Sequence, residues 1–116
     1  MAMISSHTLN GADGTHAGGI AVRVTNLNTG RIMLESATDK GGRLSERIDL
    51  GHAAATDRYE MVFATADYWA QRMDDRERII DEVVFRFSMP DPDARYHLPL
   101  ILSPNSYSCW MSVAET

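Results

Sequence analysis

Clusters of turn-forming residues interrupt this chain about every ten residues, and this spacing limits the folds open to it more than any other feature. Each cluster is rich in Gly, Asn, Asp or Pro, as at residues 10–14, 26–30 and 90–93. The stretches between the clusters are short and rich in β-branched, aromatic and aliphatic residues. Short strands separated by regular turns are typical of a β-sandwich or a β-barrel.

The sequence predicts seven strands and a weaker eighth strand. The seven are expected at residues 4–9, 20–27, 31–37, 59–64, 83–89, 95–102 and 107–113, and the weaker one at 44–48. Residues 66–72 are expected to form a short helix, because neither Gly nor Pro interrupts this alanine-containing segment. The charged segment 74–78 is expected to be a solvated loop. Because no repeat or linker divides the chain, residues 1–116 are expected to form one domain.

Alternation with a period of two indicates which side chains of an expected strand face the core. In residues 95–102 the even-numbered positions are all large and apolar. This pattern puts His97 on the face that points away from the core. In residues 4–9 the alternation is ambiguous, and it does not place His7.

The last expected strand, residues 107–113, has one large aromatic residue on its polar face. Trp110 alternates with serines, and an aromatic side chain in such a position usually marks an interface or the wall of a ligand site. A contact between subunits and a contact with a ligand explain Trp110 equally well. Cys109 falls on the opposite face and is expected to be a buried core thiol.

Composition and charge exclude several classes of function. The formal net charge is -5, and the 11 Lys and Arg residues are scattered, which argues against a nucleic-acid partner. No window approaches the ~18 apolar residues of a membrane span, and the N-terminus does not resemble a secretory signal. Cys109 is the only cysteine, so no intrachain disulfide is possible. We therefore expect a cytoplasmic protein that binds neither nucleic acid nor membrane.

Several segments resemble the 5-hydroxyisourate hydrolases, in order along nearly the whole chain. The most specific is Asp91-Pro92-Asp93-Ala94-Arg95-Tyr96-His97-Leu98-Pro99-Leu100-Ile101-Leu102-Ser103-Pro104, followed by Ser106-Tyr107-Ser108. Others are Ser6-His7-Thr8-Leu9-Asn10, Thr38-Asp39-Lys40-Gly41-Gly42-Arg43 and Tyr59-Glu60-Met61-Val62-Phe63. The resemblance implies the fold of transthyretin, an all-β sandwich of two sheets with seven to eight strands and one short helix.

The resemblance also implies a site. The family's catalytic set is a histidine near the N-terminus, an arginine after a glycine turn and the histidine of a Tyr-His-x-Pro segment. These residues match His7, Arg43 and His97 of this chain. Because the family forms tetramers with active sites between dimers, the resemblance further implies a homotetramer that binds a small planar heterocycle. Trp110 and Ser108 are the expected additional contacts with that substrate.

These residue types suit the ring opening of 5-hydroxyisourate, a reaction of urate (purine) breakdown that needs no metal and no cofactor. A base must take a proton from water, and histidine ionises near neutral pH. A cation must stabilise the developing oxyanion, and the planar fork of arginine bonds two acceptors at once. We expect His7 and His97 to share the proton transfer, with His97 favoured as the base, and Arg43 to hold the carbonyl and the adjacent nitrogens.

The sequence departs from the family's pattern mainly at its C-terminal end. Residues 110–113 are Trp-Met-Ser-Val where the family has Tyr-Arg-Gly-Ser, Arg95 replaces a histidine and His16 replaces a proline. These departures favour one alternative, a related enzyme that acts on a different small heterocycle. A second alternative is a non-catalytic carrier of a planar ligand, against which the three matching residues argue. Nothing specific supports a third, a purely structural sandwich.

Other reactive residue types have plainer explanations. His16 and His52 lie in expected loops without a partner at ligand spacing, so no metal site is expected. Asp91 and Asp93 suggest paired carboxylates, but the proline-rich segment around them is better interpreted as a turn that connects two strands.

Overall fold

The fold consists of strands and one short helix, seen in a computed structural model that describes residues 1–72 and 78–114. In chain order, the elements of the described residues are β1 Ala2–Asn10, β2 Ala21–Asn26, β3 Ile32–Ala37, β4 Arg43–Ile48, β5 Arg58–Phe63, α1 Thr65–Ala70, β6 Val83–Ser88, β7 Arg95–His97, β8 Leu100–Ser103 and β9 Ser106–Cys109. No helix in these ranges is long and apolar enough to cross a membrane.

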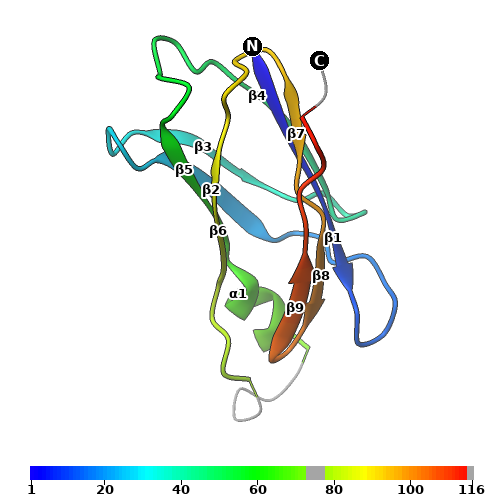
Figure 1. The fold of residues 1–116 in the computed structure, drawn as a ribbon. Helices are drawn as coiled ribbons and strands as arrows, with labels where there is room; N and C mark the ends of the chain where they lie inside the picture. The colour runs from blue at the N-terminus through cyan, green and yellow to red at the C-terminus, as the bar shows by residue number, and fades with distance from the viewer. Residues whose placement is uncertain (73–77, 115–116) are drawn as a thin grey trace.

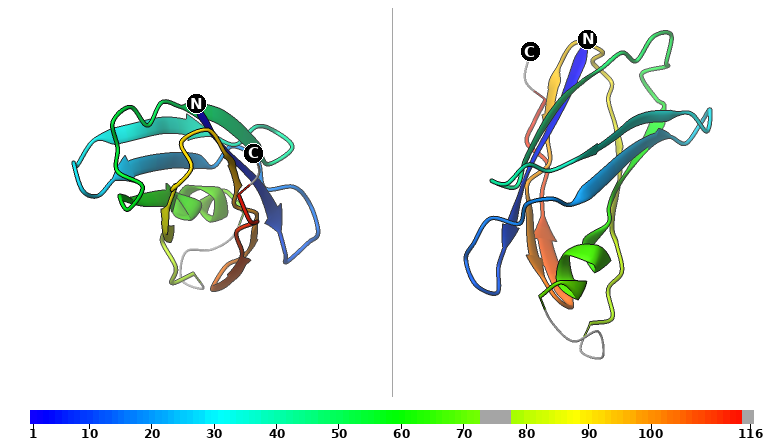
Figure 2. Two further views of the ribbon diagram at one scale, coloured as in Figure 1. Left: turned by 45° about the horizontal axis from the view of Figure 1, so that its top comes forward. Right: turned by 180° about the vertical axis from the view of Figure 1, so that it is seen from behind.

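The strands form two sheets that face one another (Figure 1). One sheet has the order β4-β1-β8-β9, with β7 also paired to β1, and the other has the order β3-β2-β5-β6. Strand β1 is antiparallel to β4 and parallel to both β7 and β8. Helix α1 lies at the same end of the sandwich as β9, as Figure 1 and the right-hand view of Figure 2 both show. The predicted two-sheet β-sandwich with one short helix is therefore confirmed.

Two of the expected strands differ in extent from the prediction, the first of them for a clear physical reason. The expected strand at residues 95–102 is divided into β7 and β8, because Pro99 has no N–H and cannot donate to a strand ladder. The expected strand at 107–113 ends at Cys109. The weak strand at 44–48, by contrast, is the full strand β4, paired with β1 along its whole length.

The core lies between the sheets and follows the predicted alternation. Along β1 every second residue is buried and the others are partly exposed, which resolves the ambiguity at His7 in favour of the outer face. Burial of a large apolar side chain contributes about 1.5–3 kcal/mol to the free energy of unfolding. The largest fully buried apolar side chains include Tyr59, Phe63, Ile4, Ile20, Met61, Leu98, Leu100 and Leu102.

The prediction that Cys109 is a buried thiol is wrong, because the residue is exposed. It ends β9, which is the outermost strand of its sheet and whose four residues are all exposed. Alternation identifies a buried face only where a second layer of the fold covers that face. Among the described residues, none of the four side chains of β9 is buried by such a layer.

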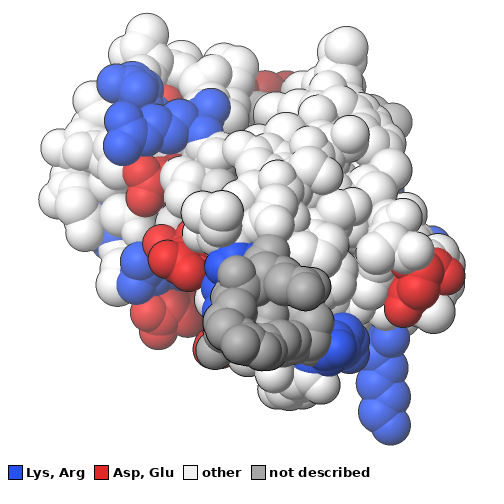
Figure 3. All heavy atoms as spheres, turned by 90° about the horizontal axis from the view of Figure 1, so that it is seen from below, with Lys and Arg blue, Asp and Glu red and all other residues white. Residues whose placement is uncertain are grey.

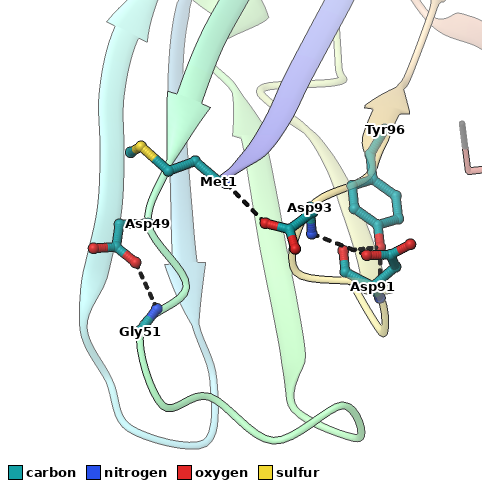
Figure 4. A network of polar contacts seen from close by, with 6 residues as sticks. All are labelled: Met1, Asp49, Gly51, Asp91, Asp93 and Tyr96. Carbon is teal, nitrogen blue, oxygen red and sulfur yellow. Dashed lines mark hydrogen bonds and ion pairs between the residues drawn. The ribbon is translucent and has the colours of Figure 1, made fainter. Parts of the chain in front are cut away.

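The segment that precedes β7 is a turn, as predicted (Figure 4). The Asp91 carboxylate accepts a hydrogen bond from the Asp93 amide at 2.9 Å, and the Tyr96 hydroxyl donates to the Asp91 carbonyl at 2.7 Å. The Asp93 carboxylate accepts from the amino group of Met1 at 2.9 Å. Both carboxylates therefore have partners within the protein, Asp91 within the turn and Asp93 at the N-terminus. The charged segment predicted to be a loop lies, apart from Arg78, outside the described residues.

Candidate active site

The register around β1 brings the three predicted catalytic residues onto adjacent strands. His7 of β1 is the Cα partner of Arg43 on β4, and Ser5 of β1 is the partner of His97 on β7. The residues that follow Arg43 and precede His97, Leu44 and Tyr96, are buried. Because side chains alternate along a strand, His7, Arg43 and His97 all project from the outer face of the same sheet.

A tight turn sets the position of Arg43. The Asp39 carboxylate accepts hydrogen bonds from the amides of Gly41 and Arg43, each at 2.9 Å. Gly42 has a φ of 74°, and a Cβ at this position would collide with the carbonyl oxygen of Thr8. Its own carbonyl accepts the Thr8 amide at 2.7 Å. Glycine therefore allows the turn to approach β1 closely, and β4 begins beside His7 as a result.

His97 is held at one ring nitrogen. Its Nδ1 lies 2.8 Å from the Ser5 hydroxyl oxygen, and this distance is that of a hydrogen bond. Its backbone carbonyl accepts the Ser112 amide at 3.1 Å, so the C-terminal segment runs beside β7. The hydrogen bond to Ser5 occupies Nδ1, and this leaves Nε2 as the nitrogen available for proton transfer.

A cavity of about 370 Å³ opens on this face. Arg43 and His97 both line it, whereas His7 lies beside it, outside the lining. The polar part of the lining consists of Ser5, Ser6, Arg43, Ser45, Arg95, His97 and Ser112. The volume is in the range of pockets for small molecules. The Arg43 guanidinium and the His97 imidazole, whose Nε2 is not used by the hydrogen bond to Ser5, therefore line the same cavity.

The electrostatic surroundings of His7 favour its neutral form. Burial contributes most to a lowered pKa of the His7 imidazole, and the positive charges of Arg43, His16 and His97 lower it further. The Gly41 carbonyl, 3.1 Å from Nε2, acts in the opposite direction. A pKa below the ordinary value of 6.5 leaves His7 uncharged at neutral pH.

Positive charge gathers around the cavity although the chain as a whole is acidic. Arg43, Arg95 and Arg47 are exposed on the outer face of this sheet, and none of them forms an ion pair within residues 1–72 and 78–114. On the face seen from below in Figure 3, in contrast, basic and acidic groups are interspersed. The cavity therefore has a local field that suits an anionic ligand or a developing oxyanion.

The two additional substrate contacts predicted from the sequence, Trp110 and Ser108, do not line this cavity. Trp110 is 51% exposed, and Ser108 is exposed on β9. The C-terminal part of the lining is Ser112 and Val113 instead. A role for Trp110 and Ser108 in substrate binding stays a prediction.

Three residues around the predicted set were not identified from the sequence. Ser5 lies two residues before His7, so the period of a strand was the signal that could have placed it on the same face. Arg95 is related to His97 in the same way. His16 gave no such signal, because its loop reaches β1 through an isolated bridge to Leu9. No group of three or more potential ligands in the described part of the chain is arranged to hold a metal ion.

The sequence model of the HIUase/Transthyretin family matches residues 4–111. The chain belongs to this family. The 5-hydroxyisourate hydrolase of Pseudomonas aeruginosa is 29% identical over 114 residues, which cover 95% of this chain and 90% of that protein. The 5-hydroxyisourate hydrolase 2 of Rhizobium meliloti is 31% identical over 112 residues, which cover 92% of each chain. The family predicted from the sequence is therefore confirmed.

Solved structures of family members have the same fold. The 5-hydroxyisourate hydrolase of Klebsiella pneumoniae superposes with a TM-score of 0.76 at 24% identity, over 97% of this chain and 100% of that chain. The transthyretin of Sparus aurata superposes with a TM-score of 0.79 at 23% identity, over 97% of each chain. A hydrolase and a transthyretin fit about equally well, so the fold does not distinguish between these two members of the HIUase/Transthyretin family.

Proposed function

We propose that this protein is a 5-hydroxyisourate hydrolase that acts in the breakdown of urate. The observation that carries the proposal is the cavity that Arg43 and His97 line together, with His7 as the strand partner of Arg43. A carrier needs a cavity but not a base opposite a fixed cation. The names of the relatives from Pseudomonas aeruginosa and Rhizobium meliloti agree with the proposal.

The proposed reaction begins when His97 Nε2 takes a proton from water and the resulting hydroxide attacks a ring carbonyl of the substrate. The carbonyl oxygen becomes an oxyanion, which the Arg43 guanidinium stabilises by charge and by two N–H donors. When the tetrahedral intermediate collapses, the ring C–N bond breaks and the departing nitrogen receives the proton from His97. One water is added and one C–N bond is lost, so no redox partner is required. His7 is the second candidate for the proton transfer.

Fresh substrate tests the proposal directly. When 5-hydroxyisourate is generated with uricase, we expect the purified protein to accelerate the decay of its ultraviolet absorbance well beyond the spontaneous rate. The control is the same protein after heat denaturation. Tight binding of planar aromatic molecules without turnover would instead support the carrier alternative.

One observation favours a second candidate function, hydrolysis of a related and more anionic heterocycle. Arg95 adds a second guanidinium to the lining of the cavity, and Ser112 and Val113 form its C-terminal part where the family has a different ending. A folded protein that leaves 5-hydroxyisourate unchanged but opens another cyclic amide would establish this alternative.

We further propose a cytoplasmic homotetramer whose site is completed where subunits meet. Support for the tetramer comes from large apolar residues that a single chain leaves uncovered near its C-terminus. Tyr107 on the edge strand β9 is 44% exposed, Trp110 is 51% exposed and Val113 is 90% exposed. Large apolar side chains that a single chain leaves this exposed are available to a second subunit. Support for the cytoplasm comes from Cys109, the only cysteine.

Trp110→Ala separates a role in substrate binding from a role in assembly. If the indole contacts the substrate, we expect KM to rise about tenfold while light scattering still reports a tetramer, because about 1.4 kcal/mol of contact energy is lost. If the variant dissociates into smaller species, Trp110 belongs to the interface. Unchanged KM and unchanged assembly would exclude both roles.

A further inference from the structure

His16 forms a close pair with His7 that the proposed reaction does not explain. His16 lies in the loop between β1 and β2, and an isolated bridge to Leu9 brings this loop back against β1. The two imidazole rings stack with their centroids 5.1 Å apart and an interplanar angle of 22°. His16 Nδ1 lies 2.9 Å from His7 Nε2, the distance of a hydrogen bond.

The second partner of His7 determines the direction of this hydrogen bond. The Gly41 carbonyl oxygen lies 3.1 Å from the same Nε2 atom, and a carbonyl only accepts. If His7 Nε2 carries the proton, its N–H is shared between the Gly41 oxygen and the lone pair of His16 Nδ1. If Nε2 carried a lone pair instead, it would face the oxygen of Gly41 without a proton between them. The arrangement therefore favours the tautomer of His7 with the proton on Nε2.

We propose that His16 is a positioning residue for His7: together with the Gly41 carbonyl it accepts the proton on Nε2 of the His7 ring, which leaves the lone pair on Nδ1. Whether this serves turnover depends on the proposed hydrolase function, but the state of the His7 ring does not. A histidine held in one tautomer presents the same nitrogen to every reaction cycle. His16 would thus strengthen the preference, set first by the Gly41 carbonyl, for Nδ1 as the atom of His7 that exchanges protons.

The charges around His7 act in the same direction. Arg43 faces it from β4, His97 from β7 and His16 from the loop, and a positive charge on any of them opposes protonation of His7. Protonation of His7 beside a charged His16 would place two cations in contact, since the nearest ring nitrogens are 2.9 Å apart. The Gly41 carbonyl contact partly offsets this effect.

Histidine NMR tests the proposal without any need for substrate. We would follow the imidazole signals of the wild-type protein, His16→Gln and the matched control His52→Gln, which changes an exposed histidine in another loop, as the pH is varied. In the wild type, the nitrogen shifts of His7 should show a protonated Nε2 and an unprotonated Nδ1. His16→Gln should raise the pKa of His7, because the positive charge that a protonated His16 places beside the His7 ring is removed. His52→Gln should leave the His7 titration unchanged.

A second variant separates the hydrogen bond from the ring contact. His16→Phe retains a ring for stacking, but the phenyl ring has no nitrogen that could accept a hydrogen bond or become charged. Because His16 is exposed, we expect the fold to tolerate the change. We expect the pKa of His7 to rise in this variant and the share of the Nε2-protonated tautomer to fall, although the Gly41 carbonyl still accepts from Nε2. A wild-type His7 protonated on Nδ1, or a His7 titration unchanged by both His16 variants, would overturn the proposal.

Turnover supplies an independent readout. If neutral His7 is required, the acid limb of the kcat/KM profile should move to higher pH in His16→Gln, by the same amount as the pKa of His7 measured by NMR, and activity on that limb should fall. The value at alkaline pH should be unchanged. If the wild-type protein does not turn over 5-hydroxyisourate at all, the proposed function fails, and the NMR titration still decides the role of His16.

Discussion

Arg43→Gln is expected to lower kcat for 5-hydroxyisourate by about 10²–10³-fold, the usual cost of removing a donor that stabilises an oxyanion. Glutamine retains length and one N–H group but loses the fixed charge and the two-pronged geometry of the guanidinium. Arg43 lines the cavity and forms no ion pair with the described residues, so its charge is directed at whatever the cavity contains. Steady-state kinetics with freshly generated substrate measure the loss.

Arg47→Gln is the matched control for this prediction. Arg47 lies on the same strand and the same face, paired with Met3, but it does not line the cavity. Both substitutions remove one exposed positive charge, so their effects on stability should be small and similar. Equal losses of activity in the two variants would mean that the general field of this face matters and that Arg43 has no special place. Full activity in Arg43→Gln would remove the arginine from the mechanism.

The fold could be predicted from this sequence because several kinds of local information agree. Turn residues divide the chain, and the alternation within β2, β5 and β8 puts apolar residues on one face. The prediction failed where that information depends on what packs outside a strand. Cys109 alternates like a core residue, yet all four residues of β9 are exposed in the described part of the chain. The break at Pro99 follows from the missing amide of proline, which outweighs the alternation of the residues around it.

The site was predictable in its residue types but not in its contacts. The resemblance identified His7, Arg43 and His97, and the strand register brings them together. The hydrogen-bond partners of His97 and His7, which are Ser5 and His16, could not be predicted from the sequence, because each contact depends on how separate segments of the chain fold together. Ser5 and His97 are 92 residues apart, and the loop that carries His16 folds back only in three dimensions. A hydrogen bond of this kind leaves no periodic signal in a single sequence.

His97→Asn is expected to lower kcat by about 10²–10⁴-fold, the range that general acid–base catalysis supplies, with a much smaller effect on KM. The asparagine amide can still hydrogen-bond to the Ser5 hydroxyl, but it cannot accept a proton from water near neutral pH. The variant therefore retains the shape and the polar contact of the site and removes only its base. Ser5→Ala should lower kcat by a smaller factor, because the His97 imidazole remains and only the hydrogen bond that orients it is removed.

The comparison of His97→Asn with His7→Asn assigns the proton transfer to one of the two histidines. His97 lines the cavity and has a free Nε2, whereas His7 lies beside the cavity with its Nε2 engaged by Gly41 and His16. If His97 is the base, its replacement should flatten the acid limb of the kcat profile, while His7→Asn should lower kcat by a smaller factor and leave that limb in place. The reverse pattern would make His7 the base. It would also require the substrate to extend beyond the cavity of the single chain, towards the surface where a second subunit is proposed to dock.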